Sequence, residues 1–165
     1  AEADAFWCFS SLMESVRDVY DVVQDDTEMG IHAALERMSQ YLRLCDEELW
    51  QHLEGQSLTP SLYALRWITL LLGQEFGLPD VLRIWDSILA QPEEGRLRFV
   101  LHVCCGMVLH IREELLHNDF AENLQRLQKY PRDIDVEDII YRAESLSKVT
   151  EPLWAKGKTT SVAVW

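Results

Sequence analysis

The chain has 165 residues, of which 48% are hydrophobic, and its 28 acidic and 15 basic residues give a formal net charge of −13. This length is typical of one domain, and the apolar fraction is sufficient for a buried core, which excludes a disordered tail. Nucleic-acid binding requires a basic surface, and a chain this acidic does not have one. We therefore expect no nucleic-acid binding. The longest apolar run, 99–111, is interrupted by His102, Gly106 and His110. It is shorter than the ~20 residues of a membrane span, so we expect no direct membrane insertion.

Apolar residues recur at intervals of three and four along most of the chain, which is the pattern of amphipathic helices. The predicted helices cover residues 4–23, 31–44, 47–54, 60–76, 79–89, 96–117, 120–130 and 136–148. Gly77 is expected to end the helix over 60–76 in a left-handed cap. No segment alternates like a strand over more than four residues, so the fold class is all-α, a bundle of about seven to eight helices. The helical pattern fails from Val149 onward, which makes 1–148 the domain and 149–165 a tail or linker.

Two charged residues lie among aromatic and leucine residues of the central helices, Arg66 beside Trp67 and Asp86 beside Trp85. A charge in such surroundings must be paired or must reach water. We interpret both as part of an ion pair or a hydrogen-bonded strut between neighbouring helices. Direct contact with a partner is the alternative.

Two residue patterns suggest chemistry, but each has a simpler structural explanation. Glu114 and His117 have the Glu-x-x-His spacing of di-iron bundles, which require a second copy of the pattern that this chain lacks. His102, His110 and His117 lie on one stripe of the predicted helix 96–117, and we interpret them as histidines at the edge of the core. The four cysteines, with no Cys-x-x-Cys pattern, favour a reducing, cytosolic compartment. Cys104 and Cys105 lie in an apolar run that favours buried structural thiols.

Several spaced sequence blocks agree with one known domain. At the centre they are Leu65-Arg66-Trp67, Gln74-Glu75-Phe76 and Leu82-Arg83-Ile84-Trp85-Asp86, with Ala5-Phe6-Trp7-Cys8-Phe9 before them and Val103-Cys104-Cys105-Gly106-Met107, Ile111-Arg112-Glu113-Glu114-Leu115-Leu116 and Tyr130-Pro131 after them. Together these blocks resemble the TBC domain, the GTPase-activating domain that acts on Rab GTPases. The resemblance covers residues 4–131 and implies an all-α TBC fold. It also marks Arg66, Trp67, Glu75, Phe76, Trp85 and Asp86 as family-signature residues, for which we expect a structural role.

In the family, hydrolysis depends on an arginine in an Ile-x-x-Asp-x-x-Arg motif and a glutamine in a Tyr-x-Gln motif. Neither motif occurs here: the residues two positions after the five tyrosines are Val22, Arg43, Leu65, Arg132 and Ala143. Ile134 is followed at the motif positions by Glu137 and Ile140. In the family both motifs precede the block that resembles Ala5 to Phe9. The resemblance therefore implies the C-terminal lobe of a TBC domain, separated from its catalytic residues.

The resemblance implies a GTPase activator in membrane trafficking, not an enzyme with an active site of its own. We expect no catalytic, cofactor-binding or metal-binding residue, and the chain has no Gly-rich phosphate loop. The implied partners are a Rab-type GTPase in its GTP form, reached through the intact parent, and the N-terminal lobe of the TBC domain. The implied location is cytoplasmic, at membranes only through the Rab. The alternative is a non-catalytic helical interaction module of a degenerate TBC-like protein.

Several arginines need a separate interpretation because the family's catalytic finger is an arginine. They lie opposite or beside the apolar stripes of the predicted helices and are Arg17, Arg37, Arg43, Arg83 and Arg112. We interpret them as solvent-facing charges, none of which serves as a finger.

Overall fold

The computed structural model describes residues 2–15, 17 and 30–157, and within these ranges every regular element is a helix. The all-α fold class is therefore confirmed. In chain order the elements are α1 (Glu2–Ser15), α2 (Ile31–Cys45), α3 (Glu47–Gly55), the short 3-10 helix η3 (Pro60–Leu62), α4 (Ala64–Thr69), α5 (Leu78–Leu89), α6 (Glu93–His110), α7 (Arg112–His117), α8 (Phe120–Gln128) and α9 (Val136–Gly157).

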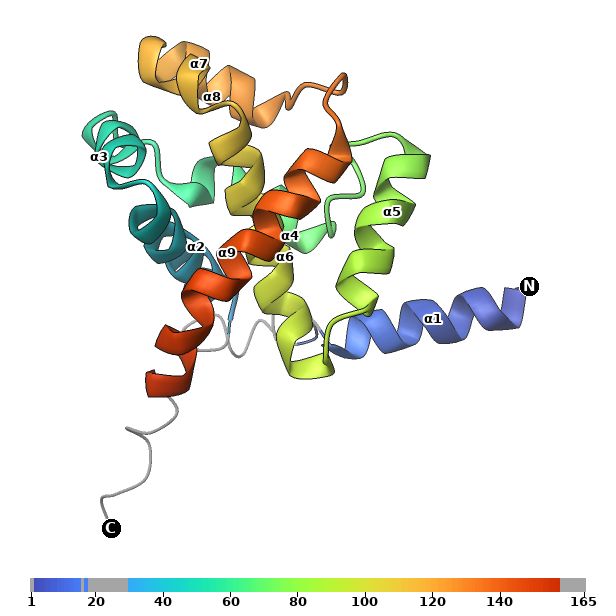
Figure 1. The fold of residues 1–165 in the computed structure, drawn as a ribbon. Coiled ribbons are helices and arrows are strands. Elements are labelled where there is room, and N and C mark those ends of the chain that lie inside the picture. The colour runs from blue at the N-terminus through green and yellow to red at the C-terminus, as the bar shows by residue number, and fades with distance from the viewer. Residues whose placement is uncertain (1, 16, 18–29, 158–165) are drawn as a thin grey trace.

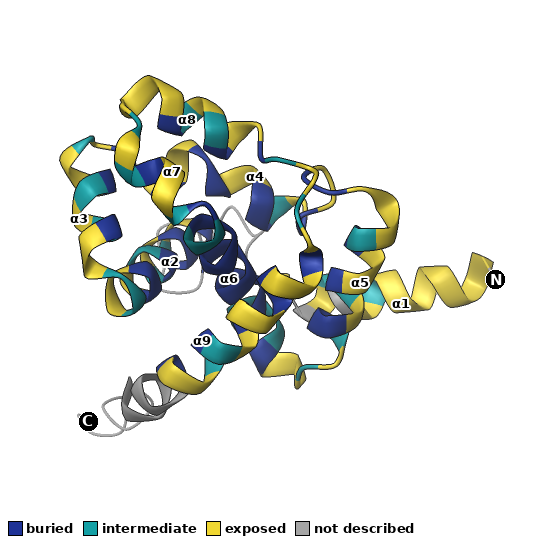
Figure 2. Cartoon of the chain, turned by 45° about the horizontal axis from the view of Figure 1, so that its top comes forward, coloured by how far each residue is buried: buried dark blue, intermediate teal, exposed yellow. Residues whose placement is uncertain are grey.

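Helix α6 forms the centre of the bundle, and every residue from Phe99 to Val108 is buried. Helix α9 packs along it more extensively than any other helix, and α2, α4 and α5 also contact it (Figure 1). Figure 2 shows buried residues gathered along α6 and on the inner faces of the helices around it. A helix that is apolar on all sides is stable in water only in such a central position.

The predicted helix over 60–76 is wrong, because the chain leaves the helical conformation after Thr69. Leu71 and Leu72 have φ angles of 47° and 64°, the left-handed region that leucine rarely adopts. Both side chains are buried there, and the indole Nε1 of Trp85 donates a 2.9 Å hydrogen bond to the Leu71 carbonyl oxygen. The left-handed cap expected at Gly77 is also wrong, since Gly77 has a φ of −67° and precedes α5. Tertiary burial thus overrides the local helical pattern.

The predicted long helix over 96–117 is also wrong at both ends. It begins earlier, after Pro92, and it breaks at Ile111, whose φ and ψ of −101° and 22° separate α6 from α7. The longest helix within the described ranges is instead α9, which continues beyond the predicted end at residue 148 to Gly157. Thr150 is buried on α9, so the packed structure extends beyond Val149.

Two predicted segments lie partly outside the described residues. The helix expected over 4–23 is observed as α1 up to Ser15, and 18–23 fall outside the description. Residues 158–165 of the expected tail also fall outside it. Within the described ranges, no helix is both long and apolar enough to cross a membrane.

Candidate functional site

Arg66 and Glu75 form a two-bond ion pair across the turn that follows α4. The Arg66 Nε donates to Glu75 Oε1 at 2.8 Å, and its Nη2 donates to Glu75 Oε2 at 3.0 Å. The Glu75 side chain is only 3% exposed, whereas that of Arg66 is 44% exposed. The same Arg66 Nη2 donates to the Gln128 carbonyl oxygen at 2.7 Å. Arg66 therefore joins α4, the left-handed turn and the end of α8.

Aromatic rings pack beside this ion pair. Trp67 is fully buried and makes edge contacts with Tyr63 and Tyr130, at centroid distances of 5.2 and 5.7 Å. Phe76 makes a third edge contact with Tyr130 at 5.8 Å, and the Tyr130 hydroxyl donates to the Met107 carbonyl oxygen at 3.0 Å. We name Arg66, Trp67, Glu75, Phe76 and Tyr130 the signature cluster. Because its three aromatic side chains and its carboxylate are buried, the cluster has the character of a structural core.

The two remaining signature residues lie apart from this cluster. Trp85 on α5 is half-buried against the core and holds the Leu71 carbonyl, as described above. Asp86 is exposed, and the partner of Arg66 is Glu75, not Asp86. Nothing in the sequence pattern singled out Glu75 as the partner, because the intervening turn was not foreseen.

Arg112 was expected to face solvent, and this expectation is wrong. Its side chain is 30% exposed and contacts three carboxylates, those of Asp46, Glu48 and Glu113. Its Nε donates to Asp46 Oδ2 at 2.5 Å, which ties the start of α7 to the start of α3. Arg83 is also paired, through Glu137 on α9 at 2.6 Å, although both side chains remain largely exposed. These two arginines link helices of the bundle.

His102 is fully buried, so its expected place at the edge of the core is wrong. Its Nε2 lies 2.8 Å from the Thr150 hydroxyl on α9, and its ring packs on Tyr41 at 4.9 Å. Burial, and to a lesser extent the charge of Arg98, lower the pKa of His102 to about 4. The imidazole is therefore neutral near pH 7.

The histidine stripe and the thiols form no reactive arrangement. The break at Ile111 places His117 on α7, where its Nδ1 lies 2.6 Å from the Glu113 carbonyl oxygen. Cys104 and Cys105 are fully buried, and burial raises the pKa of both thiols. Among the described residues, no three His, Cys, Asp or Glu side chains lie close enough to hold a metal ion.

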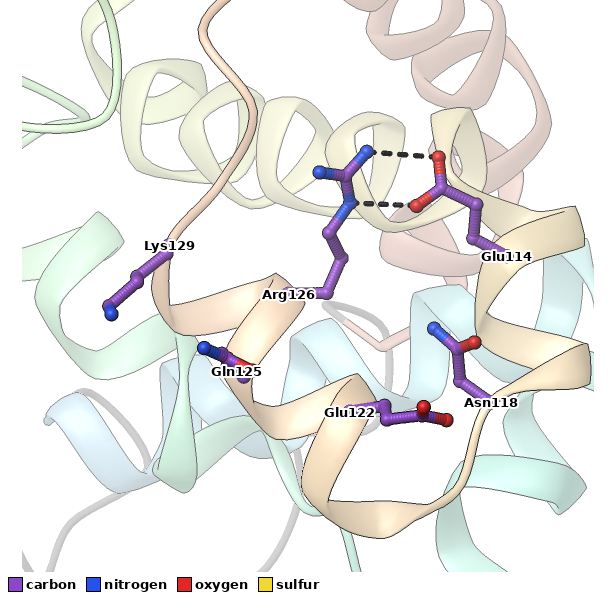
Figure 3. Close-up of a pocket in the computed structure, with 6 residues that line it drawn as sticks. All are labelled: Glu114, Asn118, Glu122, Gln125, Arg126 and Lys129. Carbon is purple, nitrogen blue, oxygen red and sulfur yellow. Dashed lines mark hydrogen bonds and ion pairs between the residues drawn. The ribbon is translucent and has the colours of Figure 1, made fainter.

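An open polar cavity of about 460 Å³ lies between α7 and α8 (Figure 3). It is lined by Glu114, Asn118, Glu122, Gln125, Arg126 and Lys129. The Arg126 Nη2 donates to Glu114 Oε1 at 2.9 Å, which directs the Glu114 carboxylate toward Arg126. Glu114 therefore serves α7–α8 packing, and the Glu-x-x-His pattern it shares with His117 has a structural explanation.

Comparison with known proteins decides the family. A model of the Rab-GTPase-TBC domain family, RabGAP-TBC, matches residues 1–116, which is more than half of the chain. The chain belongs to the Rab-GTPase-TBC domain family. The resemblance seen in the spaced sequence blocks is thus confirmed.

Relatives of known name agree with this TBC assignment. TBC1 domain family member 13 of Homo sapiens is 46% identical over 146 residues, which are 88% of this chain and 36% of the human protein. GTPase-activating protein gyp1 of Schizosaccharomyces pombe is 30% identical over 139 residues, covering 84% of this chain and 26% of the yeast protein. The crystal structure of the Ypt/Rab-GAP domain of Gyp1p matches 93% of this chain with a TM-score of 0.77 and 28% identity.

This TBC chain is much shorter than the proteins it resembles. It spans about a third of the human relative and 46% of the solved Ypt/Rab-GAP domain chain. The family match ends at residue 116, but α8 and α9 complete the same core, since Leu127 on α8 and Ile139 and Ile140 on α9 are buried in it. The TBC signature cluster itself depends on α8, because Arg66 binds the Gln128 carbonyl.

Proposed function

We propose that this chain is the C-terminal lobe of a TBC domain whose parent protein accelerates GTP hydrolysis by a Rab-type GTPase in membrane trafficking. The observation that carries the proposal is the family match over residues 1–116. The likeness to the solved Ypt/Rab-GAP domain, at a TM-score of 0.77, supports it further. In this role the signature residues, including the Arg66–Glu75 pair, would keep the lobe rigid and make no contact with nucleotide.

The catalytic groups belong, in this proposal, to a part of the domain outside these 165 residues. Neither the Ile-x-x-Asp-x-x-Arg nor the Tyr-x-Gln motif occurs in the chain. The solved Ypt/Rab-GAP domain has more than half of its length beyond the matched part, which leaves room for an N-terminal lobe carrying both motifs. That lobe is the first partner of this chain, and the GTP-bound Rab is the partner of the complete domain. The parent would reach a membrane surface only through the Rab.

Phosphate release from a panel of GTP-loaded Rab proteins tests this function. A chimera is made in which this chain replaces the matching segment of TBC1 domain family member 13 of Homo sapiens. The chimera is expected to accelerate hydrolysis by at least one Rab, on the scale of ~10³-fold or more that an arginine finger supplies. The matched control is the same chimera with the arginine of the family's Ile-x-x-Asp-x-x-Arg motif replaced by alanine, which is expected to be inactive.

The isolated chain is expected to leave the hydrolysis rate of every Rab unchanged. Acceleration by the isolated chain would contradict the placement of catalysis outside it. A folded chimera without activity would contradict the activator function and would favour the alternative, a non-catalytic interaction module. A parent sequence lacking both motifs would favour the same alternative.

A further inference from the structure

The two halves of α1 have different surroundings. In the second half, the Arg96 Nη1 on α6 donates to the Ser11 carbonyl oxygen at 3.3 Å, and Met13 packs against the core. In the first half, every residue from 2 to 9 is exposed. Figure 1 shows this half extending beyond the helices that surround α6. The bundle therefore holds one half of α1 and leaves the aromatic side chains of the other half open to water.

The exposed half carries three large aromatic side chains. Phe6, Trp7 and Phe9 are 63%, 70% and 51% exposed, and we name these three residues the aromatic end of α1. Because an α-helix turns by about 100° per residue, these rings span an arc of about 160° around the helix axis. A helix on the surface of a globular protein turns an apolar stripe of roughly 100° toward its core. The aromatic end is wider than one such stripe, so its burial requires cover from more than one side.

The helical conformation of this half also requires a neighbour. Residues 2–9 make about two turns, and an isolated helix shorter than roughly 12–15 residues is only marginally stable in water. Packing of an apolar face supplies most of the stability of a helix in a protein. The bundle does not supply that packing to residues 2–9, so another body must do so.

The comparison with the solved Ypt/Rab-GAP domain indicates which body this is. The family match begins at residue 1, so α1 lies inside the TBC domain. This chain matches only 46% of the solved domain chain, so more than half of that chain lies beyond the matched part. A body of that size can enclose an arc wider than one helix stripe. A second copy of this chain is disfavoured as the cover, because two copies with a formal charge of −13 each repel one another.

We propose that α1 is shared between the two lobes of the TBC domain: its second half packs in this lobe, and its aromatic end packs inside the N-terminal lobe. This inference rests on the proposed function, which places the N-terminal lobe outside these 165 residues. A continuous helix has a fixed rise and a fixed rotation per residue. Helix α1 therefore sets both the distance and the rotation between the lobes, and it holds the catalytic groups of the N-terminal lobe in a defined position relative to this one.

Hydrogen–deuterium exchange tests the cover and requires no substitution. The isolated chain is compared with the chimera in which it replaces the matching segment of TBC1 domain family member 13 of Homo sapiens. The amides of residues 6–9 are expected to exchange several-fold more slowly in the chimera, whereas those of α6 are buried in both proteins and are expected to change little. Equal exchange of residues 6–9 in the two proteins would overturn the proposal. Protection that appears in the isolated chain as its concentration rises would also overturn it, since a second copy would then cover the aromatic end.

The double variant Phe6→Ser/Phe9→Ser separates the cover from the bundle. The melting temperature of the isolated chain is expected to stay unchanged, because both side chains are exposed there. That of the chimera is expected to fall by several degrees, because each serine removes a buried ring and adds a buried hydroxyl group. The matched control is Cys8→Ser, since Cys8 is exposed and lies on the opposite side of α1 from the aromatic end. A chimera that melts at the same temperature with and without the double substitution would contradict the proposal.

One alanine inserted between Phe9 and Ser10 tests whether α1 links the lobes as a continuous helix. The insertion rotates the aromatic end by about 100° and shifts it by about 1.5 Å relative to the anchored half. The isolated chain is expected to keep its melting temperature, whereas that of the chimera is expected to fall, because the rings no longer face their cover. Unchanged melting of the chimera would show that α1 does not connect the lobes rigidly. Melting and hydrogen exchange do not depend on GTP hydrolysis, so this inference and the proposed function fail separately.

Discussion

Glu75 and Arg66 differ in how far water reaches them, and this difference determines what their ion pair contributes. The Glu75 carboxylate is almost completely removed from water, whereas Arg66 is partly exposed. A buried charge that loses its partner destabilises the folded state, often by several kcal/mol. The net stability that the intact pair adds is therefore smaller than the stability that is lost when one partner is removed.

Arg66→Ala is expected to lower the free energy of unfolding by about 2–3 kcal/mol, because Glu75 remains buried and unpaired. Urea unfolding followed by circular dichroism measures this loss. Arg43→Ala is the control, since Arg43 and Glu47 are 58% and 62% exposed and 3.9 Å apart. Its expected loss is below about 1 kcal/mol. An Arg66→Ala variant as stable as the unchanged chain would contradict the strut interpretation and favour direct contact with a partner.

His102 makes the stability of the fold depend on pH. Its pKa falls from about 6.5 in an unfolded chain to about 4 in the folded structure. The unfolded state therefore binds the proton more tightly, and stability is lost as pH falls from about 6.5 toward 4. The expected loss from this group is roughly 3 kcal/mol, at 1.36 kcal/mol per pKa unit.

Unfolding free energies of the unchanged chain and His102→Gln at pH 7.5, 5.5 and 4 would check this dependence. The variant is expected to be less stable at pH 7.5, because Gln fits the site less well, but to lose less stability on acidification. Identical slopes for the two proteins would contradict the assignment of the pH dependence to His102.

At the scale of elements, α6 and α9 approach closely at one glycine. A Cβ atom built at Gly106 would lie 3.1 Å from the Ile139 carbonyl oxygen on α9. Glycine in a helix costs ~1 kcal/mol relative to alanine, so its presence in the middle of α6 requires such a contact. The backbone carbonyl of Ile139 has little freedom to move aside, because it lies within α9.

Gly106→Ala is expected to destabilise the chain by about 1–3 kcal/mol despite the better helix propensity of alanine, because the added methyl group separates α6 from α9. The melting temperature measures the effect. Gly55→Ala is the matched control, since a Cβ at Gly55, the last residue of α3, would meet nothing within 4 Å. A Gly106→Ala variant more stable than the unchanged chain would show that the two helices separate at no cost.

The sequence predicted the elements well where the apolar pattern agreed with tertiary packing. Helices α2, α3 and α8 lie within two residues of their predicted ends, because an acidic residue or glycine adjoins each start and the apolar stripe faces the core. The prediction over 60–76 was wrong because nothing in Leu71 or Leu72 signals a left-handed conformation. The burial of both side chains, the distant Trp85 indole and backbone hydrogen bonds such as that from the Leu72 amide to the Trp67 carbonyl oxygen at 2.8 Å stabilise it.

The sequence identified the residues of the candidate site but did not show which of them form ion pairs with one another. The sequence blocks singled out Arg66, Trp67, Glu75 and Phe76, yet the partner of Arg66 depends on the unforeseen turn. The role of Arg112 was missed for a similar reason. The break at Ile111 directs the Arg112 side chain toward Asp46, and the apolar periodicity of the sequence did not predict that break. Long-range ion pairs of this kind follow from the fold, not from local pattern.

For the whole molecule, the buried core extends further along the chain than the segment that the family model matches. The match stops at residue 116, whereas Tyr130, Ile139, Ile140 and Ala143 are buried in the core. Removing a helix that carries several such residues exposes the apolar surface of α6 to water.

A chain that ends after residue 132 is therefore expected to lose cooperative unfolding and to bind the dye ANS, because α6 loses the cover of α9. Near-ultraviolet circular dichroism and calorimetry measure this change. A chain that ends after residue 157 keeps the described part of α9 and is the control. Sharp unfolding of the 1–132 chain would show that α9 is an accessory element.

Asp46, the partner of Arg112, makes a second contact with the same carboxylate. Its Oδ1 accepts from the Leu49 amide at the start of α3, and its Oδ2 accepts from Arg112 at the start of α7. Burial raises the pKa of Asp46, but the hydrogen bonds from Arg112 and Leu49 outweigh it and hold the pKa below its usual value. When acid finally neutralises this group, both contacts weaken in the same event. One added proton on Asp46 thus loosens the start of α3 and the start of α7 together, although Asp46 and Arg112 are 66 positions apart in the chain.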